Sequence, residues 1–335
     1  MKTINGDWNR IHRCKEVHSC GEFSYSFDHF YGTFPPHLAD IPAVSGYCDK
    51  EDNLYIITRD REHPIIVLDK DGNYIRDFGK GLFVHLHDIR ITEQNTILLV
   101  DSARHAVWEM DFEGGIVRVL GNIDIPSDSG YDPTMWKKMR RMGKTIPSDC
   151  IHNSDWEFDM ARRSITHAAP PFNKPTGVDI DSKGNLWFSD GYGNAAVHKF
   201  SLERTYVSTF GQPGDGPGKF TVPHDICIDL EDRIWIADRE GNCIHIFNPD
   251  GTLVAYVSEG LYQPTCMRFD GTYMYIGERT GGLTIMNQDL QIVAQLGAPH
   301  SAFRFHGMSL NSKGDIYLMP LHSYEEHQLL KLTRV

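Results

Sequence analysis

Short runs of apolar residues, each preceded by a polar turn, recur along this chain of 335 residues. Asx and Gly residues build the turns, and β-branched or aromatic side chains fill the runs, a pattern typical of buried strands. The runs return about every 40 residues, a period that suits four strands per unit. The six turn-and-strand segments are residues 51–58, 95–101, 183–190, 231–238, 271–278 and 313–318.

The unit around residues 231–257 shows how each copy continues. A third apolar run at 245–247 precedes the turn 248–251, and a fourth run follows at 252–257. Six copies of a four-stranded unit predict an all-β, six-bladed β-propeller that fills residues 1–335 as a single domain.

The last copy contains only three strands before the chain reaches Val335. An unassigned strand-like segment lies near the other end, at about residues 22–34. We therefore predict that this N-terminal strand joins the C-terminal blade and closes the ring, which removes an exposed sheet edge.

One stretch, residues 122–171, breaks the period and is too long for an ordinary connection. Residues 136–142 within it predict a short amphipathic helix with a basic face. Two interpretations stay open, because long loops in compact domains are often functional. The stretch is either a solvated surface insertion or a lid over one mouth of the ring.

Three histidines occupy the same point in alternate copies of the repeat: His87, His224 and His306. The intervening copies carry a hydroxyl residue there, namely Ser45, Thr176 and Thr265. This position lies on the innermost strand and faces the central channel, so the three imidazoles should converge. Three neutral imidazoles with an open position form a catalytic zinc arrangement, although other divalent metals also accept imidazole.

Further candidate chemistry lies at the strand ends. Tyr192 stands in a loop between glycines, where it could act as a general base if a metal and an arginine lower its pKa. Arg59 and Arg239 follow equivalent strands and could bind a substrate carboxylate. Packing against a neighbouring blade and inter-blade salt bridges are the alternatives. Recurring carboxylates are expected to be structural: Asp101, Asp190 and Asp238.

Composition narrows the class of partner. A net charge of −12 argues against nucleic acid or an anionic membrane surface as the main partner. No apolar stretch approaches the roughly 20 residues that span a bilayer. The first residues show no signal-peptide pattern, and the seven cysteines lack paired metal spacing. We therefore expect a soluble cytoplasmic protein with reduced thiols.

With these residues in place, the chain resembles an NHL-type propeller, and more specifically the lyase domain of peptidylglycine α-amidating enzymes. The resemblance covers about residues 40–335 and rests on the segments 189–192, 220–224 and 237–240, in that order. It implies cleavage of an N-substituted α-hydroxyglycine into an amide and glyoxylate.

Carried over by motif, the resemblance makes His87, His224 and His306 the zinc ligands. It makes Tyr192 the base that removes the substrate hydroxyl proton, with Arg59 and Arg239 as the active-site arginines.

The chain departs from that family at three motif positions. The family's disulfide cysteine after the tyrosine is Gly193 here. A methionine two residues before the last ligand is Arg304, which brings charge beside the metal. Arg304 and His300, on the approach to the last blade, are therefore candidate substrate-binding residues.

The third departure concerns a structural calcium ion. The family's acidic residue after the last histidine is Gly307 in this chain, which leaves calcium binding uncertain. Asp88 and Asp225 follow the other two histidines and could partly compensate.

We therefore expect a zinc-dependent carbon–nitrogen lyase. Its substrate would be a small, carboxylate-bearing carbinolamide of the α-hydroxyglycine or ureidoglycolate type. A metal-dependent hydrolase or lactonase on the same ring, and a non-catalytic NHL binding module, are the alternatives. The sequence does not fix the oligomeric state.

Overall fold

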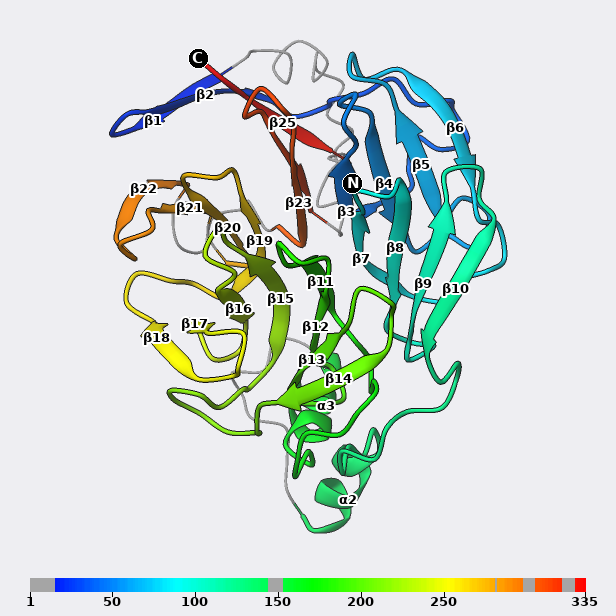
Figure 1. The fold of residues 1–335 in the computed structure, drawn as a ribbon, viewed down its shortest axis with the longest axis vertical. Helices are drawn as coiled ribbons and strands as arrows, with labels where there is room; N and C mark the ends of the chain where they lie inside the picture. Colours follow the sequence, from blue (N-terminus) through cyan, green and yellow to red (C-terminus); the bar gives the residue numbers. More distant parts are fainter. Residues whose placement is uncertain (1–15, 144–152, 281, 298–304, 321–328) are drawn as a thin grey trace, which may run out of the picture.

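The computed structural model describes residues 16–143, 153–280, 282–297, 305–320 and 329–335. Six antiparallel sheets stand around a central axis, and one edge strand of each sheet is innermost (Figure 1). Each innermost strand packs against the next, and the innermost strand of the last blade packs against that of the first. This is the closed six-bladed β-propeller that the repeat predicts.

Blades 1 to 3 contain twelve strands that follow one another in sequence order. Blade 1 comprises β3 (Ala43–Cys48), β4 (Leu54–Thr58), β5 (Ile65–Leu68) and β6 (Tyr74–Phe78). Blade 2 comprises β7 (Leu86–Ile91), β8 (Thr96–Asp101), β9 (Ala106–Asp111) and β10 (Ile116–Gly121). Blade 3 comprises β11 (Gly177–Ile180), β12 (Leu186–Asp190), β13 (Ala196–Phe200) and β14 (Tyr206–Phe210).

Blades 4 and 5 repeat the arrangement. Blade 4 comprises β15 (Pro223–Ile228), β16 (Ile234–Asp238), β17 (Cys243–Phe247) and β18 (Leu253–Val257). Blade 5 comprises β19 (Pro264–Phe269), β20 (Met274–Glu278), β21 (Gly282–Met286) and β22 (Ile292–Leu296). Blade 6 contributes the C-terminal strands β23 (Gly307–Leu310), β24 (Ile316–Met319) and β25 (Leu330–Arg334).

The N-terminal part of the chain completes blade 6, as predicted. Strand β2 (Phe23–Asp28) pairs antiparallel with β25, with Phe27 opposite Leu332. Side chains along β2 alternate between buried and half-buried, so one face of the strand packs on the core of this blade. The strand occupies only residues 23–28 of the predicted closing segment 22–34. A further strand that the pattern did not indicate, β1 (Glu16–Cys20), pairs with β2 at the outer edge.

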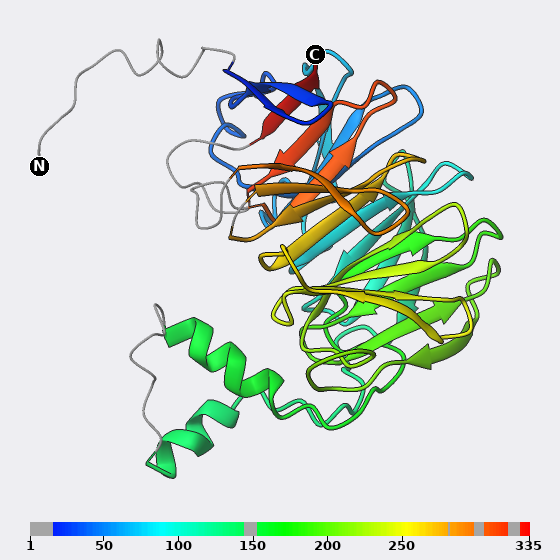
Figure 2. The same cartoon turned by 90° about the vertical axis from the view of Figure 1, so that its left-hand side faces the viewer.

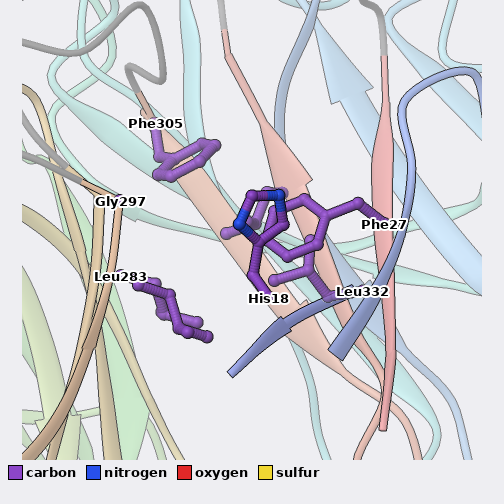
Figure 3. A pocket seen from close by; sticks show the side chains of 8 residues that line it. His18, Phe27, Leu283, Gly297, Phe305 and Leu332 are labelled. Carbon is purple, nitrogen blue, oxygen red and sulfur yellow. The ribbon is translucent and has the colours of Figure 1, made fainter. Parts of the chain in front are cut away.

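A small apolar pocket lies where this closing hairpin meets blades 5 and 6 (Figure 3). Phe27, Leu283 and Leu332 line it, and His18 is its single titratable side chain. One imidazole among aliphatic and aromatic groups offers no second ligand or proton carrier, so we assign this pocket no chemistry.

The hydrophobic core is divided among the seams between blades. Six clusters of buried residues each join two neighbouring sheets. At the seam between blades 1 and 2, for example, Ile57 and Val67 pack with Leu99 and Trp108. Because the apolar side chains pack between neighbouring sheets, polar side chains can occupy the centre of the ring.

In blades 2 to 4, recurring aspartates fasten the entry of the blade to its second strand, as their repeat position predicts. Asp101 accepts hydrogen bonds from the backbone amides of Val84 and His85, at 2.8 and 3.0 Å. Asp238 accepts from those of Thr221 and Val222, at 2.8 and 2.6 Å. These carboxylates are structural.

The insertion between blades 2 and 3 forms two helices, α2 (Met135–Arg141) and α3 (Asn153–Arg162), which stand out from one face of the ring (Figure 2). Helix α2 covers the segment predicted as a helix and buries none of its residues. Helix α3 differs, because its Trp156 and Ala161 are each only 3% exposed.

Two further observations concern the thiols and the helices. The cysteines that the structure describes as free thiols are Cys20, Cys48, Cys227, Cys243 and Cys266. Among the described residues, neither helix is long and apolar enough to cross a bilayer.

Candidate metal-binding active site

Three imidazoles from alternate blades meet on the axis of the ring. His87 lies on β7, His224 on β15, and His306 directly before β23. The ring centroids of His87 lie 4.7 Å from those of both partners, and His224 and His306 are 5.2 Å apart. One potential ligand atom from each residue lies within 4.8 Å of the other two. The structure therefore brings together the three residues that the repeat singled out.

A local irregularity aims two of these side chains. Pairing of β7 with β8 passes from Leu86 directly to Asp88, which leaves His87 outside the ladder. Strand β15 shows the same shift around His224. A bulged residue is turned away from its strand's regular alternation, which is a common way to direct a side chain into a site.

Backbone carbonyls of the adjacent blades fix the proton on each ring. The Nδ1 atom of His87 lies 2.5 Å from the Thr176 carbonyl oxygen, and that of His224 lies 2.7 Å from the Thr265 carbonyl. The Nδ1 atom of His306 lies 3.0 Å from the Val44 carbonyl. Because a carbonyl only accepts, each Nδ1 must donate, and each Nε2 keeps a free lone pair.

Burial keeps the three rings neutral. Their exposed fractions are 3%, 1% and 8% for His87, His224 and His306. Desolvation lowers each pKa well below the usual value, and neighbouring imidazoles and the guanidinium groups of Arg59 and Arg239 lower it further. Neutral imidazole is the form that binds a transition metal.

The lone pairs on the three Nε2 atoms are under-satisfied by the protein. Among the described residues, His306 Nε2 is buried without a hydrogen-bond partner. The other two Nε2 atoms both face the Tyr192 hydroxyl, at 3.0 and 2.9 Å. The single hydroxyl hydrogen of Tyr192 can be donated fully to only one of these two Nε2 atoms, and it does not reach the Nε2 atom of His306. This donor set fits a divalent cation that prefers nitrogen ligands, such as zinc.

Tyr192 reaches the histidines from the loop after β12. Both residues that flank Tyr192 must be glycine, because neighbouring groups leave no space for a Cβ atom. A Cβ atom on Gly191 would lie 2.3 Å from the Pro223 carbonyl oxygen, and one on Gly193 would lie 2.3 Å from Asn173 Oδ1. The backbone dihedral angle at these glycines is ordinary, so the space between blades, and not a left-handed turn, selects glycine here.

The two arginines near Tyr192 have different surroundings. Arg239 donates from a terminal nitrogen to the Tyr192 hydroxyl at 3.1 Å and from Nε to Glu240 at 2.7 Å. Burial opposes the charge on Arg239, but Glu240 and Tyr192 outweigh this effect and raise its pKa. The guanidinium group of Arg239 is therefore already paired with Glu240 and Tyr192.

Arg59 carries its charge without such a partner. Among the described residues, no carboxylate lies within ion-pair distance of it, and its Nε is buried without a hydrogen bond. Desolvation lowers its pKa, while the neighbouring Tyr192 acts in the opposite direction. An unpaired guanidinium beside the histidines is suited to bind a carboxylate supplied by a ligand.

Two predicted substrate-binding residues, His300 and Arg304, lie outside the described residues. Sequence reasoning missed a third neighbour of the site, Phe158 on α3. Its ring lies edge-on to Tyr192, with centroids 5.6 Å apart, and 5.9 Å from the guanidinium carbon of Arg239. The broken repeat marked the insertion, but no sequence signal singles out this aromatic residue.

The two candidate calcium ligands, Asp88 and Asp225, lie on either side of an arginine. Asp88 and Asp225 face the guanidinium group of Arg268, whose terminal nitrogens lie 3.1 and 3.3 Å from their oxygens. Gly307 adds no carboxylate, and a Cβ atom there would lie 2.4 Å from Ser45 Cα. Arg268 thus already supplies the cation between the two carboxylates.

A second cluster, Asp238, Cys243 and His245, also brings three possible ligand atoms together. Here the Gly218 amide donates to His245 Nδ1 at 3.3 Å, so the ring proton sits on Nε2, the atom facing Cys243 Sγ and Asp238. Burial also raises the pKa of the Cys243 thiol to about 12. A protonated imidazole nitrogen and a protonated thiol are poor ligands, so we assign this cluster a structural role.

Comparison with known proteins agrees with the repeat. The family model described as "NHL repeat" matches residues 220–247, which contain β15, β16 and β17 together with His224 and Arg239. The chain contains an NHL repeat.

Curated relatives of this chain include an NHL repeat-containing protein and amidating enzymes. Human NHL repeat-containing protein 3 is 30% identical over 117 residues, which cover 32% of this chain and 33% of that protein. Rat peptidylglycine alpha-amidating monooxygenase is 26% identical over 198 residues, 56% of this chain and 16% of the relative. A probable peptidyl-alpha-hydroxyglycine alpha-amidating lyase of Caenorhabditis elegans is 23% identical, over 55% and 43% of the two chains. The match thus spans less than half the length of each relative.

Solved structures show the same fold at low identity. A streptogramin B lyase superposes with a TM-score of 0.60 and 11% identity, over 93% of this chain and 98% of that one. A gluconolactonase from Xanthomonas campestris superposes with a TM-score of 0.59 and 10% identity, over 96% of both chains. The sequence relatives and these fold neighbours include enzymes that use the propeller as a scaffold.

Proposed function

We propose that this protein is a metal-dependent lyase, with zinc as its metal. Its reaction would cleave the carbon–nitrogen bond of a small carbinolamide that carries a carboxylate next to the hydroxyl-bearing carbon. One observation carries the proposal. Three neutral imidazoles converge on the axis with their Nε2 lone pairs inward, next to Tyr192 and to Arg59, which has no ion-pair partner among the described residues.

His87, His224 and His306 would hold the ion. When bound, zinc would supply a Lewis acid that polarises an oxygen of the substrate. The Nδ1 hydrogen bonds to backbone carbonyls keep the three rings oriented, because each carbonyl lies in, or directly before, the inner strand of an adjacent blade.

Arg59 would bind the substrate carboxylate. It carries a buried Nε without a partner, and a planar guanidinium group offers two parallel donors to a carboxylate. Arg239 is less suited to this role because Glu240 and Tyr192 already occupy it.

Tyr192 would remove the hydroxyl proton of the substrate. The N–H donor of Arg239, 3.1 Å from the phenol oxygen, stabilises the negative charge that the phenol must carry as a base. As the proton leaves, the C–O bond becomes a carbonyl and the C–N bond breaks, with its electrons passing to nitrogen. The proton returns to that nitrogen, so the products are an amide and glyoxylate, and the balance needs no redox cofactor.

The similarity to amidating enzymes supports this chemistry over the alternatives. The segment 189–192 with Tyr192 and the segment 237–240 with Arg239 lie in the chain in the order that the resemblance requires. A metal-dependent hydrolase on the same ring stays an alternative, and a gluconolactonase shares the fold.

Product analysis tests the proposal. The zinc-loaded protein is incubated with N-acetyl-α-hydroxyglycine in ¹⁸O-labelled water, and acetamide, acetate and glyoxylate are quantified. A lyase releases acetamide and glyoxylate in equal amounts. A hydrolase acting on the amide releases acetate that carries solvent oxygen, and a binding module releases nothing above the uncatalysed rate; either result would overturn the lyase assignment.

A further inference from the structure

The insertion places one aromatic side chain against two residues of the site. Phe158 on α3 lies edge-on to Tyr192, with an angle of 86° between the ring planes, and the guanidinium carbon of Arg239 stands over the same Phe158 ring. Tyr192 comes from blade 3 and Arg239 from blade 4, so Phe158 spans the seam between them. The Arg239 guanidinium carbon also lies 5.4 Å from the Tyr192 ring centroid. The three groups form one packed unit.

Several contacts hold the insertion in this position. The hydroxyl of Ser129 donates to the Gly193 carbonyl at 2.5 Å, directly next to Tyr192. The same hydroxyl accepts from Asn173 Nδ2 at 3.1 Å, and the Ser129 carbonyl accepts from the Thr166 amide at 2.9 Å. Both ends of the insertion are thus tied to each other and to the loop that carries Tyr192.

Helix α3 buries part of its apolar surface, and just after it Ile165 packs in the core between blades 3 and 4. Trp156 and Ala161 are almost fully buried, whereas Phe158 is half-buried. Phe158 thus packs against the phenol and the guanidinium group and still keeps part of its surface exposed. Figure 2 shows that α3 projects from a single face of the ring, so Phe158 reaches Tyr192 from that face.

We propose that Phe158 is a positioning and specificity-determining residue. It holds the Tyr192 ring beside the rings of His87 and His224. It also covers the site on the side of the leaving amide, so that small N-acyl groups are accepted and bulky ones are excluded. The size selection rests on the proposed lyase function, whereas the packing on Tyr192 does not.

The first experiment tests the packing without using turnover. Wild type, Phe158→Ala, Phe158→Leu and the control Met142→Ala are treated with tetranitromethane, and nitration of Tyr192 is followed by peptide mass spectrometry. Tyr206, 42% exposed on an outer strand, is the internal reference, and Met142 is 73% exposed. Loss of one aromatic contact should raise the Tyr192 rate about three- to tenfold relative to Tyr206. Phe158→Leu should fall between Phe158→Ala and wild type, and Met142→Ala should match wild type.

An unchanged ratio of Tyr192 to Tyr206 nitration in Phe158→Ala would overturn the positioning role. Circular dichroism and bound zinc, which should both stay at wild-type levels, exclude general unfolding. If Phe158→Ala does not fold, Phe158→Leu alone decides, because it keeps apolar volume and removes only the aromatic ring.

The second experiment tests selectivity. kcat and KM are measured for N-acetyl- and N-benzoyl-α-hydroxyglycine. Wild type should prefer the acetyl compound. Phe158→Ala should lower kcat for that compound and reduce the preference in kcat/KM at least about tenfold, as expected when a close packing contact with the substrate is lost. An unchanged preference would overturn the size selection. If wild type cleaves neither compound, the lyase assignment fails together with the size selection, while the nitration result still decides the positioning role.

Discussion

Arg268→Met should destabilise the ring more than any surface substitution of arginine. Arg268 is 3% exposed and lies between two buried carboxylates, 3.1 Å from Asp88 and 3.3 Å from Asp225. These carboxylates belong to inner strands of blades 2 and 4, and Arg268 belongs to that of blade 5. Methionine keeps an unbranched apolar side chain but removes the cation between the two carboxyl groups. Burial and Asp88 already raise the pKa of Asp225 to about 7, so without Arg268 the pair must bind a proton or keep an uncompensated buried charge.

The loss of unfolding free energy can be estimated from the hydrogen bonds that Asp88 and Asp225 keep in the variant. Asp88 keeps the Ser45 hydroxyl at 3.0 Å and the Val178 amide at 3.2 Å as donors. Asp225 keeps two backbone amides, at 2.7 and 2.9 Å. Removing one partner of a buried ion pair costs about 3–5 kcal/mol, and the remaining donors keep the total near this value for a single pair. For a chain of this size that corresponds to a fall in Tm of roughly 6–10 °C, at about 2 °C per kcal/mol.

Urea titration followed by circular dichroism, together with a thermal melt, measures the loss. The matched control is Arg163→Met, whose partner Asp159 lies 2.7 Å away but whose side chain is 61% exposed. An exposed pair of this kind contributes about 0–1 kcal/mol. A loss below about 1 kcal/mol for Arg268→Met, equal to that of the control, would refute the claim that Arg268 bridges the blades across the axis.

Three further predictions concern single side chains. Burial raises the pKa of Glu278 to about 7, so the folded state binds this proton more tightly than the unfolded state and loses stability as pH rises from about 4.5 to 7. Glu278→Gln should remove up to about 3 kcal/mol of this pH dependence of the unfolding free energy, measured by urea titration. An unchanged pH dependence would contradict the prediction. Tyr192→Phe should keep bound zinc but lower kcat about 10²- to 10⁴-fold, whereas full turnover would exclude Tyr192 as the base. Arg59→Met should raise KM about 10- to 100-fold for a carboxylate substrate, and an unaltered KM would place the carboxylate elsewhere.

Much of the fold could be predicted because the repeat encodes it locally. Each turn and the strand after it can be identified from Asx, Gly and β-branched residues, and the period then sets the number of blades. The common position of His87, His224 and His306 follows, since equivalent residues of a closed ring face the same axis. The closing strand β2 was predicted because blade 6 lacked a strand.

The unpredicted features depend on contacts between distant segments. Phe158 meets Tyr192 only because the insertion docks on blade 3 through Ser129 and Ile165, and no periodic pattern encodes that docking. The role of Arg268 depends on the distance across the axis, which strand spacing in sequence does not give. Strand β1 pairs with the outer edge of blade 6 as a fifth strand, which a repeat of four strands per blade does not predict.

Zinc content measured by elemental analysis tests the central claim most directly. Wild type and the variants His87→Ala, His224→Ala and His306→Ala are equilibrated with Zn²⁺, desalted and analysed, with circular dichroism as the check on folding. We predict one equivalent of zinc per chain in wild type and none in each folded variant. A full equivalent retained by any folded variant, or none held by wild type, would contradict the assignment of these three histidines as a metal site.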